Sequence, residues 1–166
     1  MDCVEWKNDV MQLKLFIFLL TSLVFLTVSE AQSKRKRKII IEVVTEARTY
    51  RGTPYLYGGN SKSGIDCSGL IYKCYKKVGI ALPRTAREQS KIGNSKNIGR
   101  IRPGDIVYFK FKQKGEKWWH SGIITDTSDL YNIMFIHASS SRGVVETRLN
   151  SPYYMDNIKK FRRVIR

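Results

Sequence analysis

The sequence is poor in the residues that build metal sites and disulfide frameworks. Its 166 residues include three cysteines and two histidines. Small secreted domains held by disulfides have an even and denser set of cysteines, so a disulfide framework is excluded. Two histidines and few clustered carboxylates also leave too few ligands for a zinc or iron site. We therefore expect no metal or other cofactor, and the chemistry has to come from cysteine and histidine.

Acidic residues are scarce as well, with 14 Asp and Glu against 30 Lys and Arg, which gives a formal charge of +16. This balance excludes an acidic, disordered chain and favours an anionic partner or surface. Nine Tyr, seven Phe and three Trp also argue against disorder. The sequence has no internal repeat and no glycine-rich phosphate loop ending in Lys-Ser or Lys-Thr. A chain of this length builds one core, so we expect a single folded domain.

One long hydrophobic run lies near the start, over residues 13–28. Small residues follow it at the two positions that a signal peptidase reads, which predicts a signal peptide over residues 1–31, cleaved after Ala31. The protein is then exported to the periplasm or the cell-wall space. An uncleaved membrane anchor is the alternative, although the run is close to the lower limit of ~17 residues for a bilayer span. Because acidic residues precede the run, we expect Met11 to be the true initiator.

Five consecutive basic residues, Lys34–Lys38, lie in a predicted linker over residues 32–38. Without residues 1–31 the chain keeps 28 basic and 10 acidic residues, a formal charge of +18. The basic run can hold an anionic polymer such as nucleic acid, acidic lipid or a cell-wall polymer. A solvated linker is the alternative. The folded domain is predicted over residues 39–166.

Hydrophobic spacing predicts helices first and strands afterwards. Residues 39–50 have the pattern of an amphipathic helix. A second helix begins after the capping residue Asp66 and stops at Gly79, and a third short helix is predicted over residues 85–92. From Asp105 the pattern alternates, which predicts strands over residues 106–111, 118–125, 133–138, 144–148 and 158–164. This order predicts an α+β fold in which the strands form an antiparallel meander.

Cys67 lies at the start of the second predicted helix. Unpaired N–H groups at a helix start favour thiolate over thiol, and a thiolate is the nucleophile that amide cleavage needs. The same N–H groups can stabilise an oxyanion. A buried structural cysteine is the alternative, and Cys74, two turns further along the inner face, fits that alternative well. At ~1.5 Å rise per residue the two α-carbons are roughly 10 Å apart, beyond disulfide reach.

A cysteine nucleophile requires a general base, and imidazole is the usual one. The chain offers His120 and His137, each on a predicted strand and each followed by small residues that leave room for a substrate. On neighbouring antiparallel strands the two can face each other with β-carbons about 5 Å apart, so that one imidazole orients the other. A packed or surface aromatic role is the alternative for each.

Six sequence blocks, in order and in register, resemble the NlpC family of bacterial cell-wall cysteine peptidases. They are Pro54-Tyr55-Leu56-Tyr57-Gly58-Gly59, Asp66-Cys67-Ser68-Gly69, Leu82-Pro83-Arg84-Thr85, Arg102-Pro103-Gly104-Asp105, His120-Ser121-Gly122-Ile123 and Phe135-Ile136-His137-Ala138. The resemblance covers about residues 39–166. Two positions depart from the pattern: Ser121 stands where many relatives have Val, and Tyr57 where many have Trp.

The resemblance implies a papain-like α+β fold, with the nucleophile at the start of a helix packed on an antiparallel sheet of about five or six strands. It implies that Cys67 is the nucleophile, that His120 is the base and that His137 orients it. Tyr55 would place its hydroxyl near the oxyanion. Relatives line the substrate cleft at the positions of Asp66, Ser68 and Arg84, for which helix capping, helix-turn and surface-charge roles are the alternatives.

The function implied is a peptidoglycan endopeptidase that hydrolyses a stem-peptide amide, the γ-D-glutamyl to diaminopimelate bond, through a thioester and without a cofactor. The expected partners are stem peptides and, through the basic surface, an anionic cell-wall polymer. No nucleic acid is expected, and we expect a monomer. Two alternatives stay open: an amidase or acyltransferase with the same Cys-His pair, and a basic, non-catalytic module that binds wall polymer or nucleic acid.

Overall fold

The computed structural model describes residues 3–113 and 116–165. Contacts divide the chain into two units, residues 1–37 and 38–166. Helix α1 (Cys3–Arg48) begins in the first unit and ends in the second. Residues 32–38, predicted as a linker, are therefore helical, because Lys and Arg are good helix formers and nothing in the run breaks a helix. Cleavage after Ala31 stays a prediction. Within the described ranges, no helix has the length and hydropathy that crossing a membrane requires.

The end of α1 supplies the first part of the core of the second unit. Val43 and Ala47 are fully buried there, four residues apart on one helix face. The predicted helix over residues 39–50 thus exists as the last turns of a longer one. It ends two residues earlier, at Arg48, and Gly52 adopts a φ of +80° in the turn that follows. That turn is tied to the sheet, because the Gly52 N–H donates to the Val144 carbonyl at 2.9 Å.

Helix α2 (Cys67–Lys77) confirms the predicted cap and inner face. Asp66 is extended, and its side chain accepts from the Gly69 N–H at 2.6 Å. The inner face, Leu70, Ile71, Cys74 and Tyr75, is completely buried. Helix α3 (Ala86–Gln89) is shorter than predicted. The helix ends at Gln89 because the chain then turns at Gly93, where φ is +81°. This turn leads into the edge strand β3 (Asn94–Lys96).

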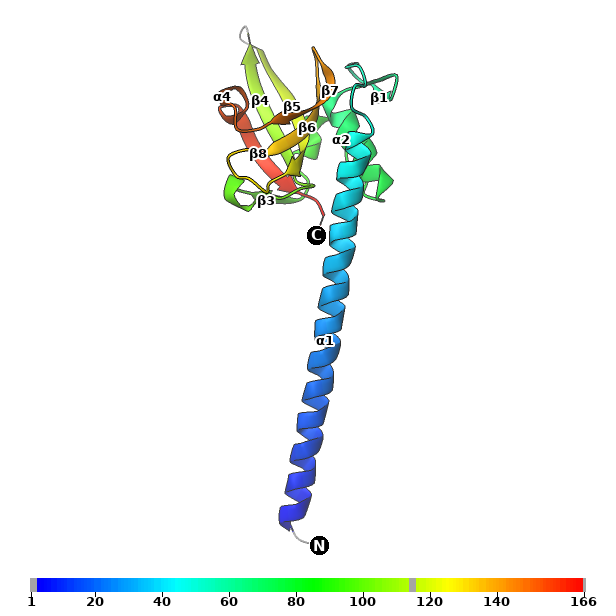
Figure 1. Ribbon diagram of the computed structural model, residues 1–166, viewed down its shortest axis with the longest axis vertical. Helices are drawn as coiled ribbons and strands as arrows, with labels where there is room; N and C mark the ends of the chain where they lie inside the picture. Colours follow the sequence, from blue (N-terminus) through cyan, green and yellow to red (C-terminus); the bar gives the residue numbers. More distant parts are fainter. Residues whose placement is uncertain (1–2, 114–115, 166) are drawn as a thin grey trace. The chain divides into compact units, whose positions relative to one another are not determined.

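A six-stranded antiparallel sheet forms the rest of the unit (Figure 1). Its strands run in the order β3-β8-β4-β5-β6-β7. Their bounds are β3 (Asn94–Lys96), β4 (Ile106–Gln113), β5 (Glu116–Asp126), β6 (Met134–Ser139), β7 (Gly143–Arg148) and β8 (Ile158–Arg163). All five predicted strands are present, so the predicted fold class is confirmed.

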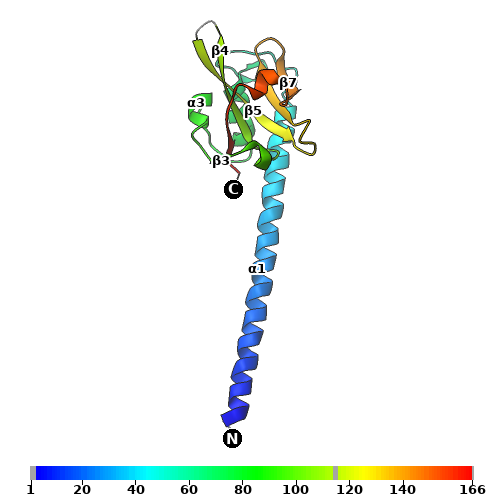
Figure 2. The ribbon, with the colours of Figure 1, turned by 90° about the vertical axis from the view of Figure 1, so that its left-hand side faces the viewer.

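The strand order differs from the predicted meander at one edge. β4 to β7 follow one another, but β8 returns to pair with β4, and the polar strand β3 pairs with β8, as Figures 1 and 2 show. β3 has no hydrophobic pattern, because its residues Asn94, Ser95 and Lys96 are all polar. Four further short elements also lack such a pattern: β1 (Asn60–Ser61), β2 (Gly64–Ile65), the 3-10 helix η1 (Ile98–Arg100) and α4 (Pro152–Met155).

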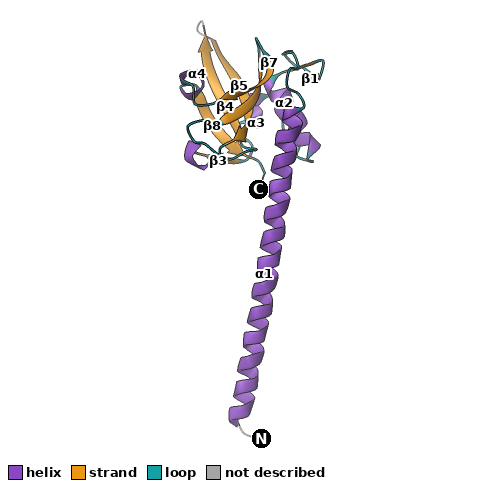
Figure 3. Ribbon diagram, in the orientation of Figure 1, coloured by secondary structure: helices purple, strands orange, loops and turns teal. Residues whose placement is uncertain are grey.

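The two faces of the sheet pack against different partners. One face buries Ile106, Tyr108, Ile123 and Ile136 together with the inner faces of α1 and α2. The other face holds a largely aromatic cluster that includes Phe109, Phe135 and, from α4, Tyr154. Figure 3 shows α2 and α4 on different sides of the sheet. Alternate residues of β5 and β6 therefore face the helices or the aromatic cluster.

Candidate active site

Cys67 is the first residue of α2 and is 8% exposed. It lines a cavity of about 490 Å³. The other residues that line this cavity include three predicted site residues, Asp66, Ser68 and Arg84, together with Tyr55, Tyr57 and Trp119. The structure thus brings the predicted nucleophile and the predicted cleft residues to one hollow. Cys67 and Cys74 are both free thiols, and Cys74 is fully buried in the core, as the sequence predicts for a structural cysteine.

A polar network around Asp66 fixes the start of α2. The Arg84 guanidinium donates to both carboxylate oxygens at 2.8 Å and also to Ser68 Oγ at 3.0 Å. The backbone N–H of Gly58 donates to the same carboxylate at 2.8 Å. Burial alone would raise the pKa of the Asp66 carboxyl, but the bonds from Arg84, Gly69 and Gly58 outweigh it and lower that pKa. Asp66 is therefore ionised, and the charged pair holds the loop that precedes Cys67.

The thiol of Cys67 does not have the lowered pKa that a helix start predicts. Burial and then the ionised Asp66 raise its pKa, and the neighbouring Ser121 hydroxyl and the N–H groups of Ser121 and Ser68 oppose this effect. Among the described residues, the buried Ser121 hydroxyl makes no hydrogen bond of good geometry, so its contact with the sulfur is weak. Burial outweighs the helix start, and the sulfur holds its proton at neutral pH.

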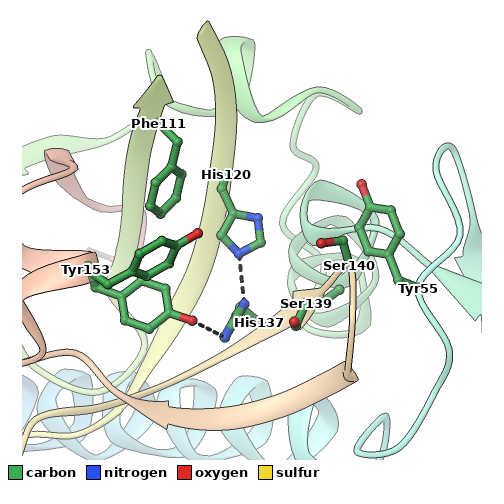
Figure 4. A pocket seen from close by; sticks show the side chains of 9 residues that line it. Tyr55, Phe111, His120, His137, Ser139, Ser140 and Tyr153 are labelled. Carbon is green, nitrogen blue, oxygen red and sulfur yellow. Dashed lines mark hydrogen bonds between the residues drawn. The ribbon is translucent and has the colours of Figure 1, made fainter. Parts of the chain in front are cut away.

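His120 and His137 form a hydrogen-bonded pair on the sheet. His120 Nε2 lies 2.8 Å from His137 Nδ1, and Figure 4 shows the two rings edge to face. They come from β5 and β6, where Ile123 pairs with Ile136, so the histidines are diagonal neighbours and not the directly facing pair predicted from the sequence. Both rings lie on the aromatic face, with Phe109 stacked on His120 and Phe135 stacked on His137.

Gly122 makes the close contact between β5 and β6 possible. A Cβ at this position would lie 2.6 Å from a ring carbon of Phe135 and 2.8 Å from the Ile136 carbonyl oxygen. Any side chain there would push away the ring that stacks on His137. The glycine after the His-Ser pair therefore serves the geometry of the histidine pair.

Both imidazoles are neutral at neutral pH. Burial lowers the pKa of His120 to about 4. Burial, followed by repulsion from His120 in its protonated form and from Arg142, lowers the pKa of His137 to about 3. A neutral imidazole has one N–H and one acceptor nitrogen, so in this pair one ring donates to the other. His120 is thus in the form that can accept a proton from a thiol.

Tyr55 lies between the cysteine side and the histidine side. A second cavity, of about 70 Å³, is lined by His120, His137 and Tyr55, and Tyr55 also lines the larger cavity of Cys67. Burial and then the nearby Cys67 raise the pKa of the Tyr55 phenol, so the hydroxyl keeps its proton. The chain also links the two sides, because Ser121, whose hydroxyl opposes the raised pKa of the Cys67 thiol, is the residue next to His120.

Two residues of the site were not predicted from the sequence. Ser121 is visible as a departure from the family pattern, but its place beside the sulfur depends on how α2 packs on β5. Tyr154, whose hydroxyl lies 3.2 Å from His137 Nε2, sits in a short helix without a hydrophobic pattern. In the described part of the chain, no group of three or more His, Cys, Asp or Glu side chains is placed to hold a metal ion.

Comparison with known proteins places these observations in a family. The NlpC/P60 family model matches residues 52–163, more than half of the chain. The probable endopeptidase NlpC of Escherichia coli K12 is 35% identical over 127 residues, which cover 76% of this chain and 79% of that one. The gamma-DL-glutamyl hydrolase of Bacillus subtilis 168 is 38% identical over 125 residues, which cover 74% of this chain and 29% of that one.

A solved structure of the same family is also similar to this chain. An NlpC/P60 family protein from Bacillus cereus ATCC 10987 superimposes with a TM-score of 0.67 at 28% identity. The match covers 76% of this chain and 40% of that one. The chain therefore spans well under half of this solved protein and of the Bacillus subtilis relative, and most of the Escherichia coli relative.

Proposed function

Because the chain belongs to the NlpC/P60 family and is a cysteine peptidase, we propose that it hydrolyses a peptidoglycan stem-peptide amide through a thioester on Cys67. The observation that supports this most is the buried, neutral His120–His137 pair, because His120 is next to Ser121, whose hydroxyl opposes the raised pKa of the Cys67 thiol. The assignment of Cys67, His120, His137 and Tyr55 to catalytic roles is part of the proposal.

The first half-reaction transfers the acyl group to sulfur. The raised pKa of Cys67 and the lowered pKa of His120 make the resting pair neutral, so the proton moves from Sγ to His120 as the sulfur attacks the carbonyl carbon. His120 Nε2 is engaged by His137, and Nδ1 is the atom that takes the proton. The N–H groups at the start of α2 and the Tyr55 hydroxyl stabilise the oxyanion. His120 then gives the proton to the leaving amine, and the C–N bond breaks.

The second half-reaction releases the acyl group. A water molecule loses a proton to His120 and attacks the thioester carbonyl, and the proton returns to the departing Cys67 sulfur. No cofactor takes part in either half. His137 keeps the His120 ring in its orientation throughout, as the third member of such arrangements does.

The proposed bond is the γ-D-glutamyl to diaminopimelate amide. Its support is the relative from Bacillus subtilis, which is named as a gamma-DL-glutamyl hydrolase. The polar set of Asp66, Ser68 and Arg84 borders the Cys67 cavity and is proposed to bind the part of the stem peptide that precedes this bond.

Export, by a signal peptide cleaved after Ala31 or with an uncleaved anchor, belongs to the same proposal. The basic run Lys34–Lys38 is proposed to hold the exported protein, acting as a monomer, on anionic wall polymer and not on nucleic acid. Deleting Lys34–Lys38 should weaken co-sedimentation with isolated sacculi, and added salt should weaken it further. Hydrolysis of small soluble stem peptides should not change. Binding that neither salt nor the deletion weakens would assign the run to a solvated linker.

Product analysis tests the proposed function. The purified chain is incubated with defined muropeptides that contain the candidate amide bonds, and the products are identified by mass spectrometry. We expect a new amine on diaminopimelate and a free γ-carboxyl on D-glutamate. Cleavage of the amide bond between the lactyl group and alanine would indicate an amidase. Formation of a new amide with an added amine would indicate an acyltransferase. Intact muropeptides that remain bound would indicate a non-catalytic module.

A further inference from the structure

The outer nitrogen of His137 faces two hydroxyl groups. Nε2 lies 3.2 Å from Tyr154 Oη and 3.4 Å from Thr147 Oγ1. Figure 4 draws the bonds on both sides of His137 as dashed lines. A chain of hydrogen-bonding groups thus runs from His120 through His137 to Tyr154, across β5, β6 and α4. The sequence motifs contain the two histidines but not the tyrosine.

The direction of this chain decides whether His120 can be a base. To accept a proton at Nδ1, a neutral His120 must hold its own proton at Nε2 and donate it to His137 Nδ1. A neutral His137 then has its proton at Nε2, where an oxygen must accept it. In the reverse direction His137 donates from Nδ1, and the proton of His120 sits on Nδ1, where it blocks attack on the thiol proton. An oxygen that accepts the proton of His137 Nε2 therefore favours the active direction, whereas a hydroxyl that donates to Nε2 favours the reverse one.

We propose that Tyr154 is a positioning residue whose phenol oxygen accepts the Nε2–H of His137 and thereby sets the tautomers of both histidines. The inference rests on the proposed function of His120. When Tyr154 accepts the Nε2–H of His137, Nδ1 of His137 is left to accept the Nε2–H of His120. This hydrogen bond stabilises the cation that forms when His120 takes the Cys67 proton.

Tyr154 is better suited to this role than Thr147. Its distance to Nε2 is shorter, and its side chain is 8% exposed. Rings on β6 and β4 fix its position: Phe135 meets it edge to face at 4.9 Å and Phe109 lies 5.4 Å away. Thr147, half-buried on β7, is the secondary acceptor.

Among the described residues, the groups with an electrostatic effect on the pKa of His137 or Tyr154 are His120, Arg142 and Tyr153, and Tyr153 raises the pKa of Tyr154. His137 is faced by His120 from β5 and by Tyr154 from α4, and Arg142, in the turn between β6 and β7, lowers the pKa of both His137 and Tyr154. Burial outweighs Arg142 and raises the pKa of the Tyr154 phenol, which stays neutral. A neutral phenol can accept from His137 without adding a negative charge beside it.

Tyr154→Phe removes the oxygen and keeps the ring. We expect kcat for muropeptide hydrolysis to fall about tenfold while KM stays within about twofold. Loss of the acceptor makes the protonated pair less stable, so the acidic limb of the kcat profile should move to lower pH. Tyr75→Phe is the matched control, since Tyr75 is also buried and donates to the Gly104 carbonyl on the other side of the sheet. It should lower the Tm and leave the acidic limb in place.

A second measurement does not depend on turnover. Histidine side-chain ¹⁵N shifts report which ring nitrogen holds the proton, and they can be recorded in Cys67→Ala. We expect protonated Nε2 on both His120 and His137, and a mixture of tautomers after Tyr154→Phe. An Nδ1 proton on His137, or an unchanged spectrum and unchanged acidic limb in Tyr154→Phe, would overturn the inference. A chain that does not cleave any muropeptide but shows the expected tautomers would contradict the proposed function alone.

Discussion

The cysteine side and the histidine side of the site are built by different means. Cys67 is held by residues close to it in the sequence, since Asp66 and Ser68 flank it and Arg84 follows within 18 positions of Asp66. His120, His137 and Tyr154 come from two strands and a short helix, and each partner is 17 residues from the next. Charge and hydrogen bonds set the first side, whereas aromatic packing and strand register set the second.

This difference has a functional consequence. The cysteine side borders the larger cavity and contains an ionised pair, so it is suited to binding a polar peptide. The histidine side is a small pocket walled by aromatic and hydroxyl side chains, and burial there lowers the pKa of both imidazoles, so it is suited to holding a neutral base. Variants on the two sides should therefore lose activity for different reasons.

The largest effect is expected at Cys67, the proposed nucleophile. Cys67→Ala should lower kcat by about four orders of magnitude or more, because no other group forms the thioester. Cys74→Ala should lower stability by about 1 kcal/mol or more through a core cavity, while kcat stays within about twofold. Rates on a defined muropeptide and urea unfolding curves measure both. Equal loss of activity in the two variants, with both folded, would contradict the assignment of Cys67.

The next largest effect on kcat is expected at the two histidines, and its size should differ between them. His120→Ala should reduce kcat as far as Cys67→Ala does, because the proton acceptor is lost. His137→Gln should keep a residual rate of about one hundredth, because an amide oxygen can still accept from His120 Nε2. The comparison uses kcat at saturating substrate. A more severe loss in His137→Gln than in His120→Ala would exchange the two roles.

A smaller effect concerns the ionised pair beside Cys67. Arg84→Met should lower kcat/KM between about 10- and 100-fold by releasing the loop before the nucleophile. The lowered pKa of Asp66 means that its ionised form stabilises the fold above the unfolded-state pKa of about 4, and that this stability is lost as the pH falls through the folded-state pKa.

The pH dependence of unfolding checks this point. Wild type should lose more stability between pH 6 and pH 3 than Arg84→Met does, as measured by urea unfolding. Arg148→Met, on the exposed end of β7, removes the same charge and serves as control. If both variants lose stability with pH as wild type does, the pair does not stabilise the start of α2.

The smallest effect is expected at Ser121. Ser121→Val should raise the pH midpoint of Cys67 alkylation by less than about one unit, since a weak donor to the thiolate is lost. It should also raise stability by about 1 kcal/mol, because a buried hydroxyl without a good bond is removed. Thr125→Val, another such hydroxyl on β5, should share the second effect and not the first. An identical alkylation midpoint in wild type and Ser121→Val would remove Ser121 from the thiolate's surroundings.

Local patterns predict most of the helices and strands, because their signals lie within one element. The cap at Asp66 and the buried face that includes Leu70 and Tyr75 are examples. The return of β8 to the side of β4 and the polar strand β3 are not predictable in this way, since backbone pairing between distant segments determines them.

In the site, too, residues within short motifs are predictable, whereas contacts between distant segments are not. The blocks around Cys67 and the two histidines predict a candidate nucleophile and its candidate bases, because the residue types that carry this chemistry stand within short motifs. The diagonal pairing of His120 with His137 depends on register, and the contact with Tyr154 depends on how α4 packs on the sheet. The raised pKa of Cys67 cannot be predicted from a motif either, because it results from burial, which is a property of the folded chain.

The most direct test is to trap the acyl intermediate. The reaction of the full chain with a stem peptide is quenched in acid at early times, and intact mass spectrometry with peptide mapping locates any adduct. We predict a hydroxylamine-sensitive adduct on Cys67 whose mass is that of the N-terminal product less one water. It should be absent in Cys67→Ala. Hydrolysis without such an adduct in any quenched sample, or an adduct on Cys74, would contradict covalent catalysis by Cys67.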